Sequence, residues 1–351
     1  MTFAAEKLID WNVATSLGRR VAGDGADLSA VDRARLFEDF AEVVPQADAL
    51  VTELTGLGPG PSRVRPWVMT RGQWLEANVR AFERVIEPFA EKVVAARHDG
   101  KFVNARRAVL GAQVGALLGY LGRRVLGQYD VFLPPDDEGL IYFVGANVVG
   151  VERKFRFPER DFRLWISTHE VAHRVQFGGV PWLRGHLAGL MGSYLESVEV
   201  DHGWLLERLR EAVREVRSGR TPARGFGWVF LLMTPDQRAM VRQMQALMSL
   251  LEGHGNFVMD AVAKDRIPGA SGFRRTLHER RNRGGLEKGF QRAIGFDVKV
   301  RQYDLGERFV ANVVNRVGME GFNKVWASPA ALPTMDEIER PDAWVARVAT
   351  P

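Results

Sequence analysis

The chain has 351 residues, enough for one large domain or two, and its 46% content of hydrophobic residues excludes a wholly disordered protein. Its 48 basic and 43 acidic residues leave a formal net charge of +5, an excess too small to predict nucleic-acid binding. Because cysteine is absent, a disulfide scaffold, a thiolate metal site and an iron–sulfur cluster are excluded, and any metal must be held by the seven histidines or by carboxylates.

The pattern over residues 1–128 predicts helices separated by clear breaks. Ser29 is a typical N-cap and starts a helical run over residues 30–44. The Gly- and Pro-rich segment 56–66 ends this region, and a Thr-Gln capping box starts the next helix, over 70–94.

The most apolar segment is Ala108–Gly122, which is flanked by arginines. At fifteen residues it is shorter than the roughly 20 that span a bilayer, so we expect no membrane association. Its glycines recur every four residues, at 111, 115 and 119, which predicts a helix packed closely against a neighbour. The acidic residues Glu6 and Asp10 interrupt the N-terminus and argue against a secretory signal, so we expect a cytoplasmic protein.

Residues 129–149 are the clearest strand signal in the sequence. Two short runs of β-branched and aromatic residues flank the turn sequence PPDDEG at 134–139, which predicts a β-hairpin. The second run, Leu140–Val144, could present an exposed strand edge to an extended peptide, or it could be purely structural.

Helical patterns return after Pro158 and fill most of the remaining sequence. Predicted helices cover residues 161–177, 183–217, 234–263 and 306–317, and a proline-punctuated tail follows at 328–344. We therefore expect a mainly α protein with a small β-hairpin. The change in texture suggests an N-terminal helical region at 1–128 and a catalytic region at 129–351, or one continuous domain.

The strongest chemical signal is the sequence His169-Glu170-Val171-Ala172-His173 within a predicted helix. Residues i and i+4 lie on one helix face, so the two imidazoles can bind one ion. Glu170 can then act as general base toward a water on that ion, which is the arrangement of zinc hydrolases. Apolar neighbours on the same helix argue against two unrelated surface histidines.

A catalytic zinc site needs a third protein ligand. Glu252 is the first candidate, because it follows the apolar run ALMSLL, where an unpaired charge would be costly and a cation would remove that cost. His254 is a rival ligand or an oxyanion donor, and Asn256 and Asp260, one and two turns after Glu252, could hydrogen-bond a ligand. Further rival ligands and possible oxyanion donors are Glu196, Glu199, His202, Arg301 and Tyr303.

A second interpretation is a di-iron carboxylate bundle. Two Glu-x-x-His motifs occur, one ending at His173 and the other running from Glu199 to His202. This interpretation leaves His169 without a role. A zinc hydrolase acting on a peptide or small amide is therefore the leading prediction, with a water on one zinc activated by Glu170.

Four segments carry a family resemblance: THEVAHRVQF at 168–177, ALMSLLEGHGNFVMD at 246–260, KVRQYDLGERFV at 299–310 and the tail from 321 to 348. Together they resemble the zincin-like, zinc-dependent metalloprotease family of actinobacteria and related bacteria, in particular the group associated with biosynthesis of the deazaflavin coenzyme. The resemblance spans residues 5–350.

This resemblance implies a mostly helical zincin-like fold with zinc bound by His169, His173 and Glu252 and with Glu170 as the base. It also leaves open a non-catalytic, zinc-binding partner protein in that biosynthesis. Gly253 and Asn256 depart from the better-known glutamate zincins.

Overall fold

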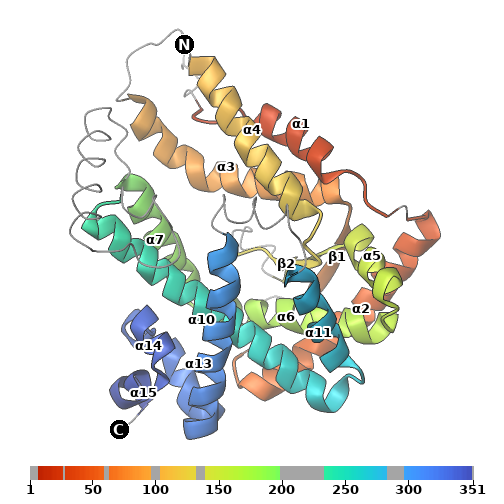
Figure 1. The fold of residues 1–351 in the computed structure, drawn as a ribbon, viewed down its shortest axis with the longest axis vertical. Helices are drawn as coiled ribbons and strands as arrows, with labels where there is room; N and C mark the ends of the chain where they lie inside the picture. Colours follow the sequence, from red (N-terminus) through yellow and green to blue (C-terminus); the bar gives the residue numbers. More distant parts are fainter. Residues whose placement is uncertain are drawn as a thin grey trace. The chain divides into compact units, whose positions relative to one another are not determined.

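The computed structural model describes residues 7–26, 28–58, 63–95, 103–131, 139–197, 233–282 and 296–349. It is mainly helical with one small sheet, as the sequence predicts (Figure 1). The chain divides into two compact units. The first comprises residues 1–52, 58–178 and 262–270, and the second comprises residues 53–57, 179–261 and 271–351. The predicted division after residue 128 falls inside the first unit and stays a prediction.

Most helices and strands of residues 7–179 begin and end close to the breaks predicted from the sequence. They are α1 (Trp11–Ala22), α2 (Ala30–Thr55), β1 (Arg65–Met69), α3 (Arg71–Ala95), α4 (Val103–Gly122), β2 (Gly127–Tyr129), β3 (Leu140–Val144), α5 (Gly145–Phe155) and α6 (Glu159–Gly179). Ser29 and Thr70 cap their helices as predicted, the first paired with Asp32 and the second with Gln73.

The glycine stripe of α4 packs against α1, which confirms the prediction of a closely packed helix (Figure 1). A Cβ atom on Gly111, Gly115 or Gly119 would collide with a backbone carbonyl oxygen of α1 or the residue that caps it. Only glycine allows backbones to approach this closely along four-residue steps. No helix among the described residues is long and apolar enough to cross a membrane.

The sheet corrects two predictions. The sequence reading did not predict β1, which lies beside the Gly- and Pro-rich break and pairs in parallel with β3. β2 pairs with β3 on the other side, in the antiparallel manner expected of a hairpin. The strand order is therefore β1-β3-β2, and β3 is the central strand without a free edge, so the predicted peptide-binding edge at Leu140–Val144 is wrong.

The sheet and its covering helices form the core of the first unit. Phe143 of β3 stacks on Phe40 of α2, with ring centroids 3.9 Å apart. On the other face, Trp74 and Leu75 of α3 pack with Leu118 of α4 in one buried cluster. Burial of β3 on both faces holds its C-terminal end in place, and α5 and then α6 follow from that end.

The second unit contains the remaining elements. They are α7 (Leu183–Glu196), α10 (Pro235–Arg266, of which residues 235–261 belong here), α11 (Ala270–Asn282), α13 (Phe296–Asn323), two 3-10 turns (Lys324–Trp326 and Pro329–Ala331), α14 (Met335–Glu339), α15 (Pro341–Trp344) and a π-helical turn (Val345–Ala349). α10 starts at the predicted Thr234–Gln237 capping box. The predicted helix 183–217 continues beyond α7 into residues outside the described part.

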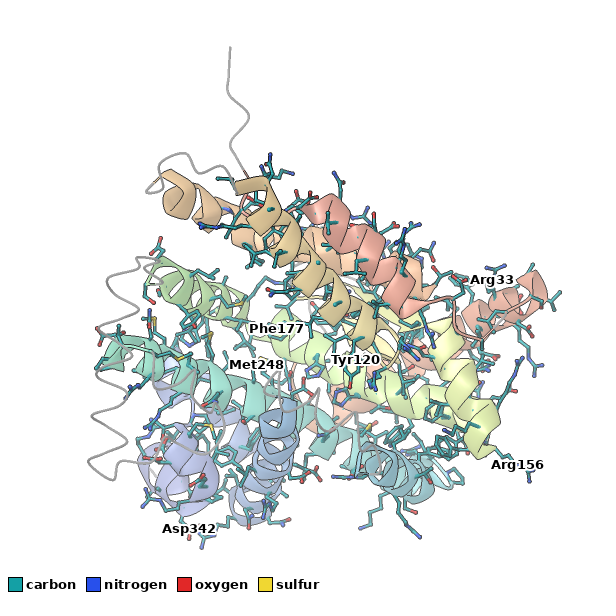
Figure 2. All side chains as sticks on the ribbon, turned by 45° about the horizontal axis from the view of Figure 1, so that its top comes forward. Arg33, Tyr120, Arg156, Phe177, Met248 and Asp342 are labelled. Atoms are coloured by element: carbon teal, nitrogen blue, oxygen red, sulfur yellow. The ribbon has the colours of Figure 1, made fainter. Side chains whose placement is uncertain are left out.

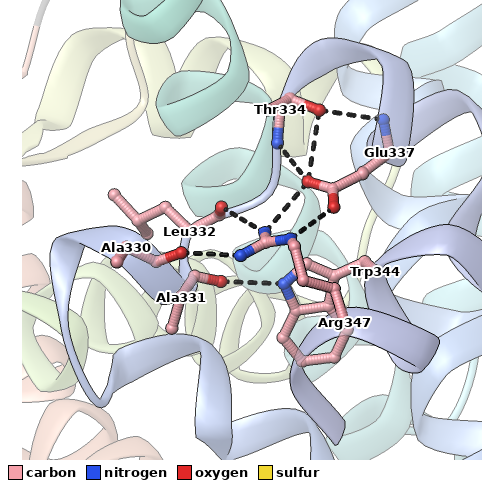
Figure 3. Close-up of polar contacts among 7 residues, drawn as sticks. All are labelled: Ala330, Ala331, Leu332, Thr334, Glu337, Trp344 and Arg347. Carbon is pink, nitrogen blue, oxygen red and sulfur yellow. Dashed lines mark hydrogen bonds and ion pairs between the residues drawn. The ribbon is translucent and has the colours of Figure 1, made fainter.

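α13 is longer than the predicted helix 306–317 and contains a non-helical residue, Gly318, with φ 71°. It crosses α10 at a close contact, because a Cβ on Gly306 would collide with the carbonyl oxygen of Ser249. The tail is more helical than predicted. Figure 3 shows Arg347 bound to Glu337 and to two carbonyl oxygens, with Trp344 donating to Ala331 O at 2.8 Å.

Candidate metal centre

Helix α6 carries the candidate site and is held in place by buried ion pairs. Arg163, 3% exposed, binds Glu152 of α5 through two hydrogen bonds of 2.9 and 2.8 Å and also pairs with Asp39 of α2. Eleven residues later, Arg174 pairs with Asp48 of α2 at 2.6 Å. Burial raises the pKa of both Glu152 and Asp48, although the facing arginine opposes the rise in each case.

The two histidines of the motif converge on one point. Their Nε2 atoms lie 3.2 Å apart, and the two rings meet edge to face at 89°. A tetrahedral zinc with bonds of about 2.0–2.1 Å to nitrogen holds two such atoms roughly 3.3–3.4 Å apart. The imidazoles of His169 and His173 therefore have the spacing of two ligands on a single ion.

A partner that the sequence reading missed orients the second histidine. Gln176, fully buried, lies with its Oε1 3.0 Å from Nδ1 of His173. This contact is best made with the proton of His173 on Nδ1, which turns the Nε2 lone pair toward His169. The sequence feature that could have indicated this contact is the position of Gln176, one helical turn after His173.

Glu170 is held beside the histidines by strand β2. Its Oε2 accepts a hydrogen bond of 2.9 Å from the backbone N–H of Tyr129. The side chain also fits against Gly127, where a Cβ atom would lie 2.7 Å from Cγ of Glu170. Glu170 is only 9% exposed. Its carboxylate is therefore buried, and the contacts with β2 fix its position. Neither backbone partner could be read from the motif.

Four further predicted site residues, Glu252, His254, Asn256 and Asp260, lie in the second unit along α10. Glu252 and Asn256 are half-buried there, one turn apart. Asp260 forms an ion pair with Arg274 of α11, which also pairs with Glu307 of α13. This network gives Asp260 a role in joining three helices, and its predicted contact with a metal ligand stays a prediction.

His254 lies in an aromatic cluster. Its ring is fully buried and stacks on Phe322 with centroids 5.3 Å apart, while Trp326 meets it edge-on at 5.5 Å. These contacts favour a packing role for this histidine within the second unit.

The other candidate ligands and oxyanion donors are described by the structure only in part. Glu196 is exposed at the end of α7. Tyr303 and Arg301 belong to α13, but their side chains are outside the described part. Glu199 and His202, on which the di-iron interpretation depends, also lie outside the described residues.

Comparison with known proteins agrees with this chemistry. A crystal structure described as "a putative hydrolase with a novel fold from Chloroflexus aurantiacus" is similar to this chain with 33% identity and a TM-score of 0.70, covering 97% of this chain and 98% of that one. No curated protein matches the chain. Residues 9–345 match the zincin-like metallopeptidase family, so a metal-dependent hydrolase chemistry is indicated, and the chain belongs to that family.

Proposed function

We propose that this protein is a zinc-dependent hydrolase that cleaves peptide or small amide bonds, with one zinc held by His169, His173 and Glu252 and with Glu170 as general base. The observation that carries the proposal is the 3.2 Å separation of the two histidine Nε2 atoms, with Glu170 between them in the sequence. Membership of the zincin-like metallopeptidase family supports the same reaction class.

The proposed third ligand rests on the chemistry of α10. Glu252 is a half-buried carboxylate directly after Leu250 and Leu251, which are 0% and 2% exposed. A carboxylate in such surroundings is stabilised by a cation. With no cysteine in the chain, a carboxylate also completes the ligand set that zinc hydrolases of the His-Glu-x-x-His type use. Asn256, one turn later, is proposed to hydrogen-bond this carboxylate.

When bound, the metal would make water a stronger nucleophile and polarise the carbonyl under attack. The protein's own contribution is the placement of a base. Because Tyr129 N–H holds one oxygen of Glu170, the carboxylate keeps a fixed orientation in which it can accept the proton of the attacking water. Glu170 then returns this proton to the leaving amine. Tyr303 is the proposed donor to the oxyanion.

The proposal is tested by metal analysis of protein purified without added metal. We expect about one zinc per chain, whereas two irons per chain would support the di-iron carboxylate protein. Glu170→Gln should retain zinc and lose hydrolysis by roughly 10²–10⁴-fold, the usual contribution of a general base. Loss of metal in this variant would show that Glu170 is a ligand and would contradict the proposal.

The third ligand is tested separately. Glu252→Gln should weaken zinc binding strongly, and Asp260→Asn, the matched control on the same helix, should leave affinity unchanged because Asp260 pairs with Arg274. Unchanged affinity in Glu252→Gln would remove Glu252 from the ligand set.

A non-catalytic role would give a different result. A protein that binds one zinc but hydrolyses no member of a broad peptide and amide library would be a zinc-binding partner protein. We also propose, on the resemblance of its motif segments, that the protein acts in the cytoplasm and belongs to the group associated with deazaflavin coenzyme biosynthesis. Deletion of its gene and measurement of the coenzyme in the host would test that association.

A further inference from the structure

The first unit contains a cavity of about 300 Å³ that the proposed hydrolysis does not use. Its walls come from the first turns of α2 and α6 and from the end of α5. Leu36, Val149 and Phe157 form the apolar part of the lining. Four arginines contribute the cationic part: Arg35, Arg153, Arg156 and Arg163. A mixed lining of this kind suits a ligand with an apolar body and an anionic end.

The carboxylates around the cavity are already engaged. Glu152 and Glu159 both bind Arg163, at 2.8 and 3.1 Å, and Asp32 accepts hydrogen bonds from the N–H and hydroxyl of Ser29. With Asp39, which also pairs with Arg163, the acids balance the four arginines in number. Three of these acids face Arg163, whereas Asp32 keeps its charge beside the neutral Ser29 and attracts Arg153 and Arg35.

The three other arginines are not neutralised in the same way. Arg35 lies 3.8 Å from Glu159, a distance at which the pair is weak. Arg153 and Arg156 form no ion pair with the residues that the structure describes, and the charge of Asp32 acts on Arg153 without such a contact. The cavity therefore has guanidinium groups available to an incoming anion. Guanidinium groups bind phosphate oxygens in pairs of parallel hydrogen bonds.

The backbone conformation of Arg156 is an independent observation at this site. It caps α5 in the left-handed conformation, with φ 54° and ψ 43°, and is the one residue other than glycine with positive φ in the described part of the chain. Glycine is the usual residue at this position because it adopts the conformation without strain. Here an arginine accepts the strain, and its side chain lines the cavity (Figure 2 labels Arg156 at the end of α5). Such strain is found at functional positions.

We propose that this cavity is a second ligand site, which binds the phosphate monoester of a small apolar or aromatic compound through Arg35, Arg153 and Arg156. The site is separate from the metal centre. Arg163 precedes His169 by six residues on α6, which corresponds to about 9 Å along the helix and about 240° around it. The ligand therefore contacts the first turns of the metal-binding helix from a different face.

The experiment is isothermal titration of the full-length protein with phenyl phosphate, benzoate and inorganic phosphate at low salt. We expect phenyl phosphate to bind most tightly, because it has both the dianionic group and an apolar ring. Arg156→Gly should weaken its binding at least tenfold without loss of thermal stability, since glycine relieves the strained backbone. Arg156→Lys should retain part of the affinity.

Two controls keep the result interpretable. Arg20→Ala removes an exposed arginine from the last turn of α1 and should leave phenyl phosphate binding unchanged. Arg153→Ala removes a second cavity cation and should weaken binding as Arg156→Gly does. The proposal is overturned by absence of phenyl phosphate binding, by unchanged affinity in Arg156→Gly, or by tighter binding of benzoate. Zinc content and hydrolysis are measured independently, so failure here leaves the proposed hydrolase untouched.

Discussion

Gln176 is the residue through which the orientation of His173 can be tested. Its Oε1 lies 3.0 Å from Nδ1 of His173, and the side chain is fully buried. Gln176→Leu keeps the approximate volume but removes the acceptor, so we expect zinc affinity to fall about 10–100-fold, the usual effect of losing such a partner. Competition with a chromogenic chelator measures the affinity.

A matched variant separates orientation from packing at this position. Gln176→Glu keeps an acceptor for the His173 ring and should bind zinc at least as tightly as Gln176→Leu. If both variants bind zinc as the natural protein does, Gln176 does not position the histidine and its burial is purely structural.

At the residue scale, the sequence predicts what is local along one helix. His169, Glu170 and His173 could be identified because their spacing alone brings them together. Tyr129, whose N–H holds Glu170, is 41 positions away in sequence, and nothing in the strand pattern indicates this contact. The fit of Gly127 against the Glu170 side chain likewise depends on how the sheet meets α6.

The packing of α1 against α4 can be tested directly by substitution of one glycine. A Cβ on Gly115 would collide with the carbonyl oxygen of Ala14, and backbone atoms cannot move aside as a flexible side chain can. Gly115→Ala should therefore lower the free energy of unfolding by about 3 kcal/mol, at the upper end of the usual cost of overpacking. Urea unfolding followed by circular dichroism measures the change.

Gly150 provides the opposite case in a helix of the same unit. It lies in α5, and a Cβ there meets nothing within 4 Å. Gly150→Ala should raise the free energy of unfolding by roughly 0.5–1 kcal/mol, because alanine loses less backbone entropy in a helix. Equal effects of the two substitutions would show that the close approach of α1 and α4 does not limit stability.

At the element scale, helices were predicted well and strand pairing was not. Capping boxes and a glycine period are signals within one segment, and they located α3, α4 and the start of α10. β1 has five residues, RPWVM, and follows a Gly- and Pro-rich break, so its pattern is too short to distinguish it from a loop. Without β1, β3 was expected at an edge, although it is the central strand.

At the scale of the whole molecule, composition limited the chemistry before any element was placed. A chain without cysteine cannot bind a metal through thiolate sulfur, and the two histidines found side by side agree with this restriction. The division into two units was not predictable, because each unit combines segments that are far apart in the sequence. A change from helical to strand-like residue patterns separates segments that follow one another in sequence. Compact units are instead defined by contacts in space.

The pH dependence of folding stability tests the C-terminal segment of the second unit. Burial raises the pKa of Glu337, but the hydrogen bonds from Arg347 and Thr334 outweigh burial and hold its pKa below the usual value of 4.5 (Figure 3). A carboxyl group with a lowered pKa stabilises the folded state above its unfolded pKa, and this contribution is lost as the pH falls through the folded value.

Glu337→Gln should therefore lower the free energy of unfolding by about 1 kcal/mol at pH 7, a modest value because Arg347 is partly exposed. The difference from the natural protein should persist down to about pH 5 and shrink as the pH falls below 4.5 toward the lowered pKa of folded Glu337. Urea unfolding at pH 7, 5 and 4 measures it, and the exposed Glu339→Gln is the control. A difference that stays constant across this range would mean that the Arg347 contact does not depend on the charge of Glu337, and that Trp344 and the backbone contacts hold the segment instead.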